Sequence, residues 1–452
     1  MVRVNAVARF DCRAHAQSCL LRQKSAGRHK RRTYPMHVLV IGAGVIGMTT
    51  AWALARDGHQ VTVLDGGPEP ASGASHANGA QLSYSYVAPL AGPSIWKDLP
   101  KLLWGRDAPV RFRAGFDLRQ YRWGLKFLAA CTGAKARGTT EALLKLAFLS
   151  RDVLGGAKDL REIEFDHVQA GKLVVYSTPE SFAAAKAQTA FQQTLGCKQE
   201  VLDAPACLAL EPALQAIAHR LVGGIFTPDD AAADPRKLCL GLLKLLEGHN
   251  SGVQFHFNTA VIRLLKEQGR LVGAETANGV FRADAYVLAG GISSVELARG
   301  IGLDLPLYPI KGYSLTLDVA NENAAPRVSV TDYGNKVVYA RLGQKLRVAG
   351  MADIVGSDLS LEPDRVAQLT RQAAETFPVS PQAPSQQPWC GLRPATPSGR
   401  PILGKSGIDG LWLNVGHGAL GLTLAFGSAA AVAAVIGGKQ APVSLADFSL
   451  QA

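Results

Sequence analysis

Hydrophobic residues near the start of the chain form short continuous runs on either side of a helical pattern. Residues 38–41 are a β-branched apolar run, as expected of a strand that is buried on both faces. Residues 48–55 are small and apolar and predict a helix, and residues 61–64 form a second apolar run. The order strand, helix, strand predicts a βαβ unit, and hence an α/β fold with a parallel sheet.

Glycines occupy the turn between the first strand and the helix. The motif reads Gly42, Ala43, Gly44, Val45, Ile46 and Gly47, which is GxGxxG spacing. Such glycines permit a tight turn, a close approach of a pyrophosphate to the backbone, and packing of the helix on the strand. Asp65 ends the second strand, where its carboxylate can accept hydrogen bonds from an adenosine ribose. Together these features predict a dinucleotide-binding unit.

A stretch of small and polar residues, 72–81, follows the second strand. Because it lacks bulk it can pass close to a large ligand, and we count Asn78, Gly79 and Gln81 among the candidate ligand contacts. A flexible loop without a ligand is the alternative interpretation. Further along, the apolar run 285–289 ends at Gly290, so a second glycine-lined strand end is expected beside the first turn.

The middle of the chain departs from the βαβ rhythm. Residues 84–138 are rich in Trp, Arg and Pro, and residues 305–388 are strand-rich and polar. We assign both to a second domain, which is therefore discontinuous in sequence. Between these segments the periodicity predicts helices at 141–154, 181–195 and 235–246, and strands at 171–177 and from residues 253, 261 and 271.

The C-terminal part holds a second glycine-rich turn. A strand from residue 411 leads to Gly416, Gly418 and Gly421, and a helix of small residues runs to 436. No acid follows about twenty residues later, so a second dinucleotide unit is not expected. A helix N-terminus aimed at a ring that gains negative charge on reduction fits better. The uncharged helix contains many Ala and Gly residues, so we interpret it as buried rather than transmembrane.

Length and charge limit these interpretations. At 452 residues the chain exceeds one ordinary domain, so we expect two. The net charge is +12, but residues 1–35 contribute +8, and the remainder predicts no nucleic-acid-binding face.

That basic leader resembles a targeting segment; we favour a native start at Met36 with an upstream extension. Seven scattered cysteines and the absence of metal-ligand spacing predict a reducing compartment, no disulfide framework and no metal site.

These motifs resemble the FAD-dependent D-amino acid oxidase superfamily, and within it the bacterial D-amino acid dehydrogenases of the small-subunit type. The matching stretches are residues 41–47, 76–81, 211–214, 309–315, 391–397 and 414–423. The resemblance implies a Rossmann-like, doubly wound FAD-binding domain and a discontinuous α+β substrate domain on a mainly antiparallel sheet. We expect the FAD-binding domain at 36–88, 139–167, 215–304 and 389–440, the substrate domain at 89–138, 168–214 and 305–388, and a tail at 441–452.

The resemblance also implies roles for individual residues, with FAD held non-covalently. The pyrophosphate would lie on Gly42, Gly44, Val45, Ile46 and Gly47, the adenosine ribose on Asp65, and the adenine on the backbone of Val261. The loop residues Asn78, Gly79 and Gln81 and the strand end at Gly290 would complete the cofactor site. The flavin ring would lie against Gly416, His417, Gly418, Leu420, Gly421 and Thr423.

The carboxylate-binding arginine of the family falls on Arg393, whose planar guanidinium suits a substrate carboxylate. A surface salt bridge is the alternative role for Arg393. Tyr313 and Tyr339 are candidates either to close the substrate pocket or to pack in the core or on the surface. The implied activity is oxidative deamination of D-amino acids to 2-oxo acids and ammonia by hydride transfer to flavin. Electrons would pass to a quinone or respiratory-chain acceptor. The implied location is cytoplasmic, with peripheral contact with the bacterial inner membrane.

Three other functions stay open at this point. An oxygen-using oxidase of sarcosine, glycine or proline-like secondary amines could attach its flavin to a cysteine, and Cys390 lies close to Arg393 in sequence. A scaffold protein would bind flavin or nucleotide without turnover. An NAD-dependent dehydrogenase fits the first glycine motif alone, but the C-terminal glycine turn argues against it.

Overall fold

The structure is a computed structural model and describes residues 35–93, 95–96, 108–248, 251–378 and 387–451. The basic leader lies outside the described residues apart from its last residue, so the start at Met36 stays a prediction.

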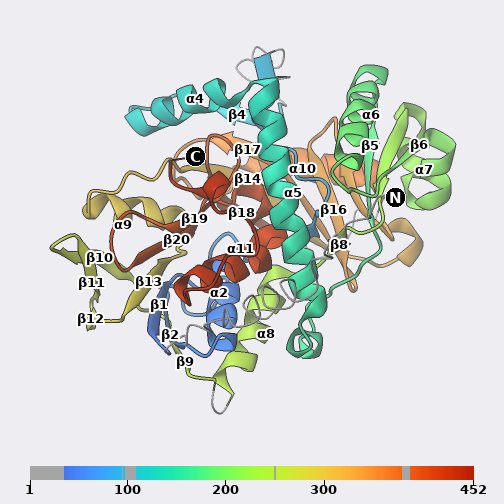
Figure 1. Cartoon of the computed structure of the whole chain (residues 1–452). Helices are drawn as coiled ribbons and strands as arrows, with labels where there is room; N and C mark the ends of the chain where they lie inside the picture. The colour runs from blue at the N-terminus through green and yellow to red at the C-terminus, as the bar shows by residue number, and fades with distance from the viewer. Residues whose placement is uncertain (1–34, 94, 97–107, 249–250, 379–386, 452) are drawn as a thin grey trace, which may run out of the picture. The chain divides into compact units, whose positions relative to one another are not determined.

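The predicted βαβ unit is present at the start of the fold. β1 (His37–Ile41) and β2 (Gln60–Leu64) pair in parallel, and α2 (Val45–Arg56) connects them. They belong to a six-stranded sheet in the order β19-β20-β13-β1-β2-β9, which is parallel except at its β19 edge (Figure 1). The remaining strands are β9 (Val253–His256), β13 (Ala285–Leu288), β19 (Ile402–Lys405) and β20 (Leu411–Val415).

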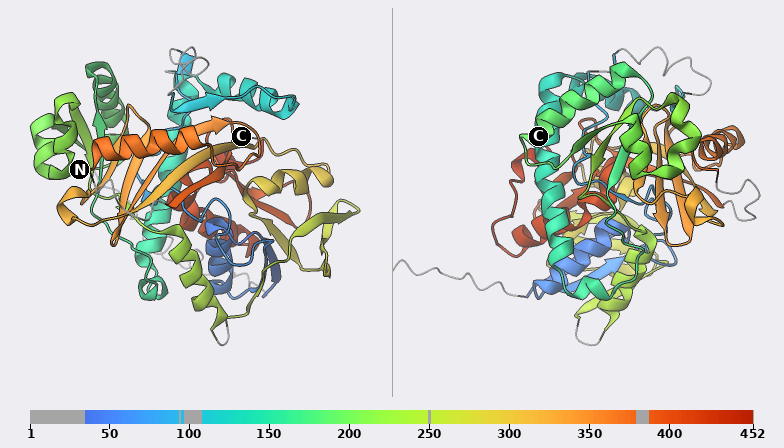
Figure 2. Two further views of the ribbon diagram at one scale, coloured as in Figure 1. Left: turned by 180° about the vertical axis from the view of Figure 1, so that it is seen from behind. Right: turned by 90° about the vertical axis from the view of Figure 1, so that its right-hand side faces the viewer.

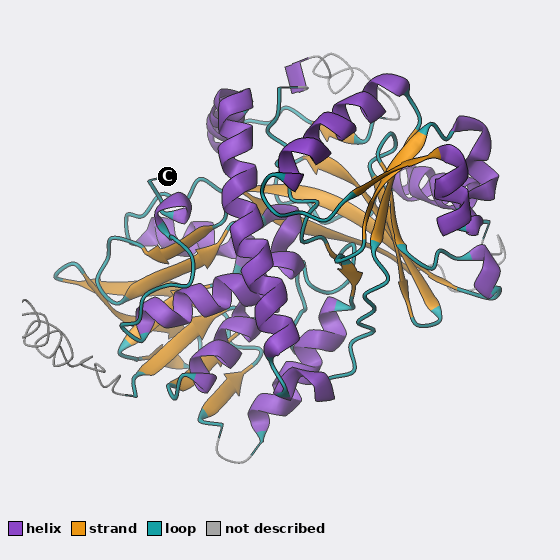
Figure 3. Ribbon diagram, turned by 45° about the vertical axis from the view of Figure 1, so that its right-hand side comes forward, coloured by secondary structure: helices purple, strands orange, loops and turns teal. Residues whose placement is uncertain are grey.

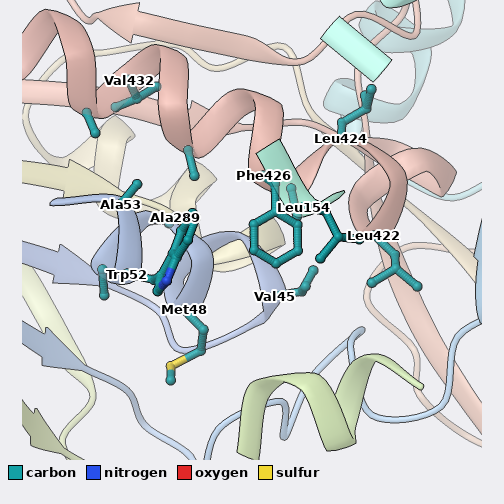
Figure 4. Packing of buried hydrophobic residues seen from close by; sticks show 14 of the residues in the cluster. Val45, Met48, Trp52, Ala53, Leu154, Ala289, Leu422, Leu424, Phe426 and Val432 are labelled. Carbon is teal, nitrogen blue, oxygen red and sulfur yellow. The ribbon is translucent and has the colours of Figure 1, made fainter. Parts of the chain in front are cut away.

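Helices cover one face of this sheet and bury its apolar residues. They are α2, α5 (Gly133–Gly156), α8 (Pro235–Glu247) and α11 (Gly421–Ile436). Trp52 of α2 meets Phe426 of α11 edge-on, with ring centroids 5.4 Å apart (Figure 4). Asp234 caps α8 and Pro235 starts it, because the carboxylate accepts from the first backbone N–H groups.

The opposite face packs against α9 (Ser294–Gly300) and a small antiparallel sheet. That sheet consists of β10 (Val261–Glu267), β11 (Arg270–Thr276) and β12 (Gly279–Phe281), as the hydrophobic pattern predicts.

The C-terminal helix is the segment for which the sequence raises the question of a membrane span. In the described part of the chain, Gly418–Ile436 alone is long and apolar enough to cross a membrane, and 72% of its apolar window is buried. α11 packs directly on α2 and α5. This burial supports a core helix.

A second sheet of nine strands is mainly antiparallel. Its order is β18-β14-β17-β16-β15-β5-β7-β6, and β4 pairs with β17. Figure 3 shows its strands as a group separate from the six-stranded sheet. The strands are β4 (Val110–Phe112), β5 (Lys172–Tyr176), β6 (Glu200–Asp203), β7 (Gly223–Thr227), β14 (Tyr308–Asp318), β15 (Ser329–Asp332), β16 (Val337–Leu342), β17 (Lys345–Ile354) and β18 (Gln387–Ala395).

The two faces of this second sheet have different covers. Helix α10 (Pro363–Thr376) packs on one face, which we call the helix-covered face (Figure 2). Tyr313 points toward it, because its side chain is buried in one cluster with Leu369 and Ala373 of α10. Because side chains alternate along a strand, Ser314 points to the opposite face. Residues 76–83 cross that face, which we call the loop-covered face, and the Ser314 hydroxyl donates to the carbonyl oxygen of Ala77 at 2.6 Å.

Shorter elements complete the fold around the second sheet. They are α4 (Leu118–Ala130), α6 (Pro179–Gln193), α7 (Ala204–Leu210) and the two-stranded pair β3 (Gln81–Leu82) and β8 (Ala231–Ala232). Two predicted domain boundaries need correction, because β7 and all of β18 belong to the nine-stranded sheet and not to the nucleotide-binding part. Local apolar pattern shows that a strand is buried but not which sheet it joins.

Candidate functional site

The first glycine turn follows β1 and lies against the end of β13. Gly42 has a φ of +109°, and a Cβ there would lie 2.7 Å from the carbonyl oxygen of Ala289. A Cβ on Gly47 would lie 1.8 Å from the carbonyl oxygen of Gly42, so the fold itself requires both glycines. At Gly44, by contrast, the nearest atom to a Cβ is the Ser75 hydroxyl oxygen at 3.4 Å. The chain leaves room above Gly44, which is where a pyrophosphate needs to approach the backbone.

Asp65 lies beside this turn at the end of β2. Its carboxylate accepts hydrogen bonds from the backbone N–H of Ala43 at 2.6 Å and of Gly67 at 2.7 Å. These two bonds hold the carboxylate between the glycine turn and the following loop. Its place matches that of an acid at the end of the second strand of a dinucleotide-binding unit.

Val261 and Gly290 lie near the same turn. A Cβ on Gly66 would meet the Cβ of Ala260 at 3.1 Å, which places the start of β10 next to the end of β2. A Cβ on Gly42 would lie 2.8 Å from the Cα of Gly290. The structure therefore brings both predicted residues to the edge of the sheet where Gly42 lies.

The segment 72–83 is held at both ends and is not the flexible loop that was the alternative. The Ser75 hydroxyl accepts from the backbone N–H of Val45, at the N-terminus of α2, at 3.0 Å. On the loop-covered face, the carbonyl oxygen of Asn78 accepts from Arg347 at 2.9 Å. The loop thus spans from the glycine turn to the second sheet.

Gly79 and Gln81 also lie on the loop-covered face. A Cβ on Gly79 would lie 3.0 Å from a methyl group of Val338 in β16, so this residue passes close to the sheet. The side chain of Gln81 accepts from the ammonium of Lys172 at 2.7 Å. The predicted contact residues of the loop therefore lie against the nine-stranded sheet.

The second glycine turn follows β20. Gly416 has a φ of +82°, and a Cβ there would lie 2.8 Å from a methyl group of Thr396. The His417 ring is buried and its Nε2 lies 3.0 Å from the hydroxyl oxygen of Ser428. The Ser428 hydroxyl donates its proton to the carbonyl oxygen of Leu424 at 2.6 Å. It can therefore only accept from the imidazole, so His417 Nε2 is the donor to Ser428. Burial lowers the pKa of His417 to about 3, which makes it a neutral structural residue rather than a general base.

The first turn of α11 faces the same loop. Gly418 has a φ of +52°, and a Cβ there would meet no heavy atom of the described residues within 4 Å. Leu420 and Gly421 form the N-terminus of α11. Thr423 accepts a hydrogen bond at its hydroxyl from the backbone N–H of Ser83 at 2.9 Å. The helix N-terminus and the loop therefore lie side by side at the carboxyl ends of the parallel strands.

Arg393 lies on β18 with its side chain on the loop-covered face. The guanidinium occupies the space above Gly312 of β14, where a Cβ would lie 2.3 Å from it. One of its nitrogens donates to the carbonyl oxygen of Met351 at 2.8 Å. Burial lowers the pKa of Arg393, and Asp353 opposes this shift. Among the described residues Arg393 takes part in no ion pair, so the salt-bridge alternative is not supported. This half-buried cation is able to bind an anion.

Both candidate tyrosines are on the other face. Tyr313 and Tyr339 are buried in the cluster beneath α10, and the Tyr339 hydroxyl lies 3.0 Å from that of Thr376. Their placement at a substrate pocket therefore needs correction: each is one residue out of phase with the strand positions that face the loop. Cys390 pairs with Tyr313 across the strands and points the same way, away from the loop-covered face. This orientation argues against attachment of a flavin to Cys390.

Three residues that the sequence pattern does not single out also lie at this site. Arg347 and Lys172 bind the loop, as described above. Trp389 stacks on His76 of the loop, with ring centroids 6.2 Å apart. The sequence does contain a signal for Lys172, because a lysine begins a strand that is otherwise apolar. For Arg347 and Trp389, only the strand pairing reveals which face of the sheet they occupy.

The described residues contain no group of three or more His, Cys, Asp or Glu placed to hold a metal.

The chain matches the family of FAD-dependent oxidoreductases (DAO) over residues 37–435. It is 45% identical over 426 residues to D-amino acid dehydrogenase 2 of Ralstonia nicotianae, covering 92% of this chain and 100% of that protein. It is 46% identical over 404 residues to D-amino acid dehydrogenase 2 of Pseudomonas aeruginosa, covering 88% and 94%. The fold is similar to that of glycine oxidase from Geobacillus kaustophilus, with a TM-score of 0.73 at 22% identity, covering 92% and 98% of the two chains.

Proposed function

Because the chain belongs to the family of FAD-dependent oxidoreductases, we propose that it binds FAD and oxidises D-amino acids to 2-oxo acids and ammonia. The names of its relatives support the D-amino acid as substrate. The observation that carries the proposal is the position of Arg393. It is a half-buried guanidinium without an acidic partner among the described residues, on the face crossed by the loop that begins at the glycine turn.

The residues at the carboxyl ends of the parallel strands fit FAD. The space above Gly44 suits the pyrophosphate, and the N-terminus of α2 offers N–H groups and a positive dipole end to it. In this proposal Asp65 would hold the adenosine ribose and Val261 the adenine. The N-terminus of α11, from Gly418 to Thr423, suits a ring that becomes more negative on reduction. When bound, FAD supplies the two-electron acceptor for the hydride of the substrate.

The protein has little proton chemistry to perform in this proposal. Arg393 holds the substrate carboxylate and so fixes the orientation of the α-carbon. His417 stays neutral because burial lowers its pKa to about 3. The sheet and the loop exclude water from the reacting atoms. The released imine hydrolyses in water to the 2-oxo acid and ammonia.

For the electron acceptor we propose a membrane quinone or respiratory-chain component, with the protein cytoplasmic and in peripheral contact with the inner membrane. The surface of α4 supports this contact: it extends outward in Figures 1 and 2 and exposes apolar and basic side chains together. They are Phe116, Leu118, Tyr121, Leu125, Arg122 and Lys126. α4 is also next to the site, because Trp123 donates to the carbonyl oxygen of Ala395, two residues beyond Arg393, at 2.8 Å.

The test of the activity is anaerobic bleaching of the purified yellow protein by matched D- and L-amino acids. We expect bleaching by D-amino acids only, and reoxidation by a quinone far faster than by oxygen. Bleaching by L-amino acids or by glycine and sarcosine alone would contradict the proposal. Rapid peroxide formation in air would show that oxygen, and not a quinone, is the electron acceptor.

The test of the membrane contact is co-sedimentation with vesicles that contain anionic phospholipid. We expect Leu118→Glu with Leu125→Glu to abolish sedimentation and to leave turnover with a soluble dye unchanged. Ile262→Glu is the control, since Ile262 is an apolar residue that is 62% exposed on β10, outside α4. Equal sedimentation of both variants would contradict a role for α4.

A further inference from the structure

Lys172 is a buried lysine in direct contact with the loop-covered face of the site. It is the first residue of β5 and only 2% exposed. Its ammonium donates to the side-chain oxygen of Gln81 at 2.7 Å and to the hydroxyl of Ser83 at 2.8 Å. It also lies 4.3 Å from the ring centroid of Tyr86. All three partners belong to the segment that continues the cofactor loop.

These partners connect the ammonium to the N-terminus of α11. The backbone N–H of Ser83 donates to the Thr423 hydroxyl at 2.9 Å, and that hydroxyl lies 3.4 Å from the carbonyl oxygen of Gln81. Thr423 is in the first turn of α11, which borders the proposed flavin site. The ammonium is therefore linked through Gln81 and Ser83 to the helix end that carries a partial positive charge.

The nearest acid does not neutralise Lys172 by a direct ion pair. The Asp230 carboxylate accepts from the backbone N–H of Ser85 at 3.2 Å, and its second oxygen is buried without a partner among the described residues. Burial raises the pKa of Asp230 and lowers the pKa of Lys172, and each group opposes the shift of the other. The ammonium has two hydrogen-bond acceptors, Gln81 and Ser83, whereas one oxygen of Asp230 has no partner among the described residues. The hydrogen bonds therefore favour the charged form of Lys172.

An isolated buried charge is costly, and a well-packed apolar side chain at this place in a strand would avoid that cost. Burial with a strongly shifted pKa is more often found where a charge has a function. The partners of Lys172 are the loop and the N-terminal end of α11, next to which the flavin ring is proposed to lie. A reduced flavin ring is more negative than an oxidised one, so a nearby positive charge would stabilise the reduced form.

We infer that Lys172 is a positioning residue whose buried ammonium, acting through Gln81 and the N-terminus of α11, raises the reduction potential of the bound flavin. The inference rests on the proposed binding of FAD beside the N-terminus of α11 and goes beyond that proposed function. A lysine that merely fastens the loop would affect stability and flavin retention but not the relative affinity for the oxidised and reduced cofactor.

The same sheet contains a matched control. Lys311 of β14 is also fully buried, but it points to the helix-covered face, where its ammonium pairs with Asp358 at 3.2 Å. It lies 5.4 Å from the ring centroid of Tyr313, as Lys172 lies over Tyr86. Replacing either lysine by methionine deletes one buried ammonium of the same sheet.

The experiment compares the holoenzyme with Lys172→Met, Lys172→Arg and Lys311→Met. The readouts are the flavin midpoint potential, by equilibration with a reference dye, and the affinity for sulfite, a small anion that reports how electron-poor the flavin is. We expect Lys172→Met to weaken sulfite binding about tenfold and to lower the midpoint potential by about 30 mV, the value for a tenfold change in a two-electron couple. Lys172→Arg and Lys311→Met should stay within about twofold of the parent protein.

An unchanged potential in Lys172→Met, or an equal drop in Lys311→Met, would overturn the inference. If Lys172→Met does not fold, Lys172→Gln tests it with the same sign, because a glutamine keeps a hydrogen-bond donor for the loop but removes the charge; an unchanged sulfite affinity there would overturn it as well. These outcomes require a protein loaded with flavin. A parent protein that binds no flavin would instead contradict the proposed function itself.

Discussion

The two faces of the nine-stranded sheet hold the same kinds of cation but satisfy them differently. On the helix-covered face, Arg365 of α10 pairs with Asp353 of β17, and Lys311 pairs with Asp358. On the loop-covered face, Arg393 and Lys172 donate to neutral oxygens of Met351 and Gln81. Arg347, on the same face, is intermediate, because it donates to the carbonyl oxygen of Asn78 and also pairs with Asp234 at 3.7 Å.

This difference separates structural charge from functional charge. A buried cation that is paired with a carboxylate contributes little net field beyond its partner. Cations that donate to neutral oxygens leave a positive potential, and on the loop-covered face that potential surrounds the place proposed for an anionic substrate and a reducible ring. Substitutions on the two faces should therefore have separate consequences for activity and for stability.

The largest expected effect is the loss of cofactor from the variant Gly44→Val. The branched side chain would occupy the space above Gly44 without a clash in the fold itself, since the nearest atom to a Cβ is 3.4 Å away. We expect a folded, colourless protein, measured by its flavin absorbance and circular dichroism. Recovery with a full complement of flavin would place the cofactor elsewhere.

The second effect is on turnover, in the variant Arg393→Ala. Deleting one partner of a desolvated charge pair removes about 3–5 kcal/mol, or roughly 10²–10³-fold or more in kcat/KM. Flavin content should be unchanged, and Arg393→Lys should recover only part of the activity because a lysine cannot form the bidentate contact.

Arg365→Ala on the helix-covered face is the control for that variant. It leaves Asp353 buried without its guanidinium, so we expect a lower melting temperature with nearly normal KM in the protein that remains folded. A loss of kcat/KM in Arg365→Ala as large as in Arg393→Ala would remove the distinction between the faces.

The sequence predicts the elements of this fold more reliably than the directions of their side chains. The first glycine turn, the helix after Asp234 and the hairpins from Val261 to Phe281 rest on local patterns, and the structure has them. Tyr313 and Gly312 differ by one position, and a shift of one residue exchanges the faces of a strand. An irregularity in the pairing of β14 with β17 between Lys311 and Tyr313 adds to the ambiguity. The contact of Lys172 with Gln81 joins residues 91 positions apart and has no local signal.

The third effect is a pH dependence of stability through His417. Burial lowers its pKa from the ordinary value of 6.5 to about 3 in the folded protein, so the unfolded chain takes up a proton that the folded chain does not. Stability is therefore complete above pH 6.5 and falls as the pH decreases toward 3. Between about pH 6.5 and pH 5 the loss from this group is about 2 kcal/mol. Denaturant unfolding of the parent and of His417→Gln should show a flatter profile in the variant; parallel profiles would contradict the burial of a neutral imidazole.

The smallest effects concern the two tyrosines beneath α10, and they should differ in sign. The Tyr339 hydroxyl lies 3.1 Å from the carbonyl oxygen of Gln372 and 3.0 Å from the Thr376 hydroxyl, so Tyr339→Phe should lower the free energy of unfolding by about 1 kcal/mol. The Tyr313 hydroxyl is buried without a partner among the described residues, so Tyr313→Phe should be neutral or stabilising. Both variants should keep kcat/KM within about twofold of the parent, because neither hydroxyl lies on the loop-covered face. A tenfold loss in either variant with normal stability would return that tyrosine to the substrate pocket.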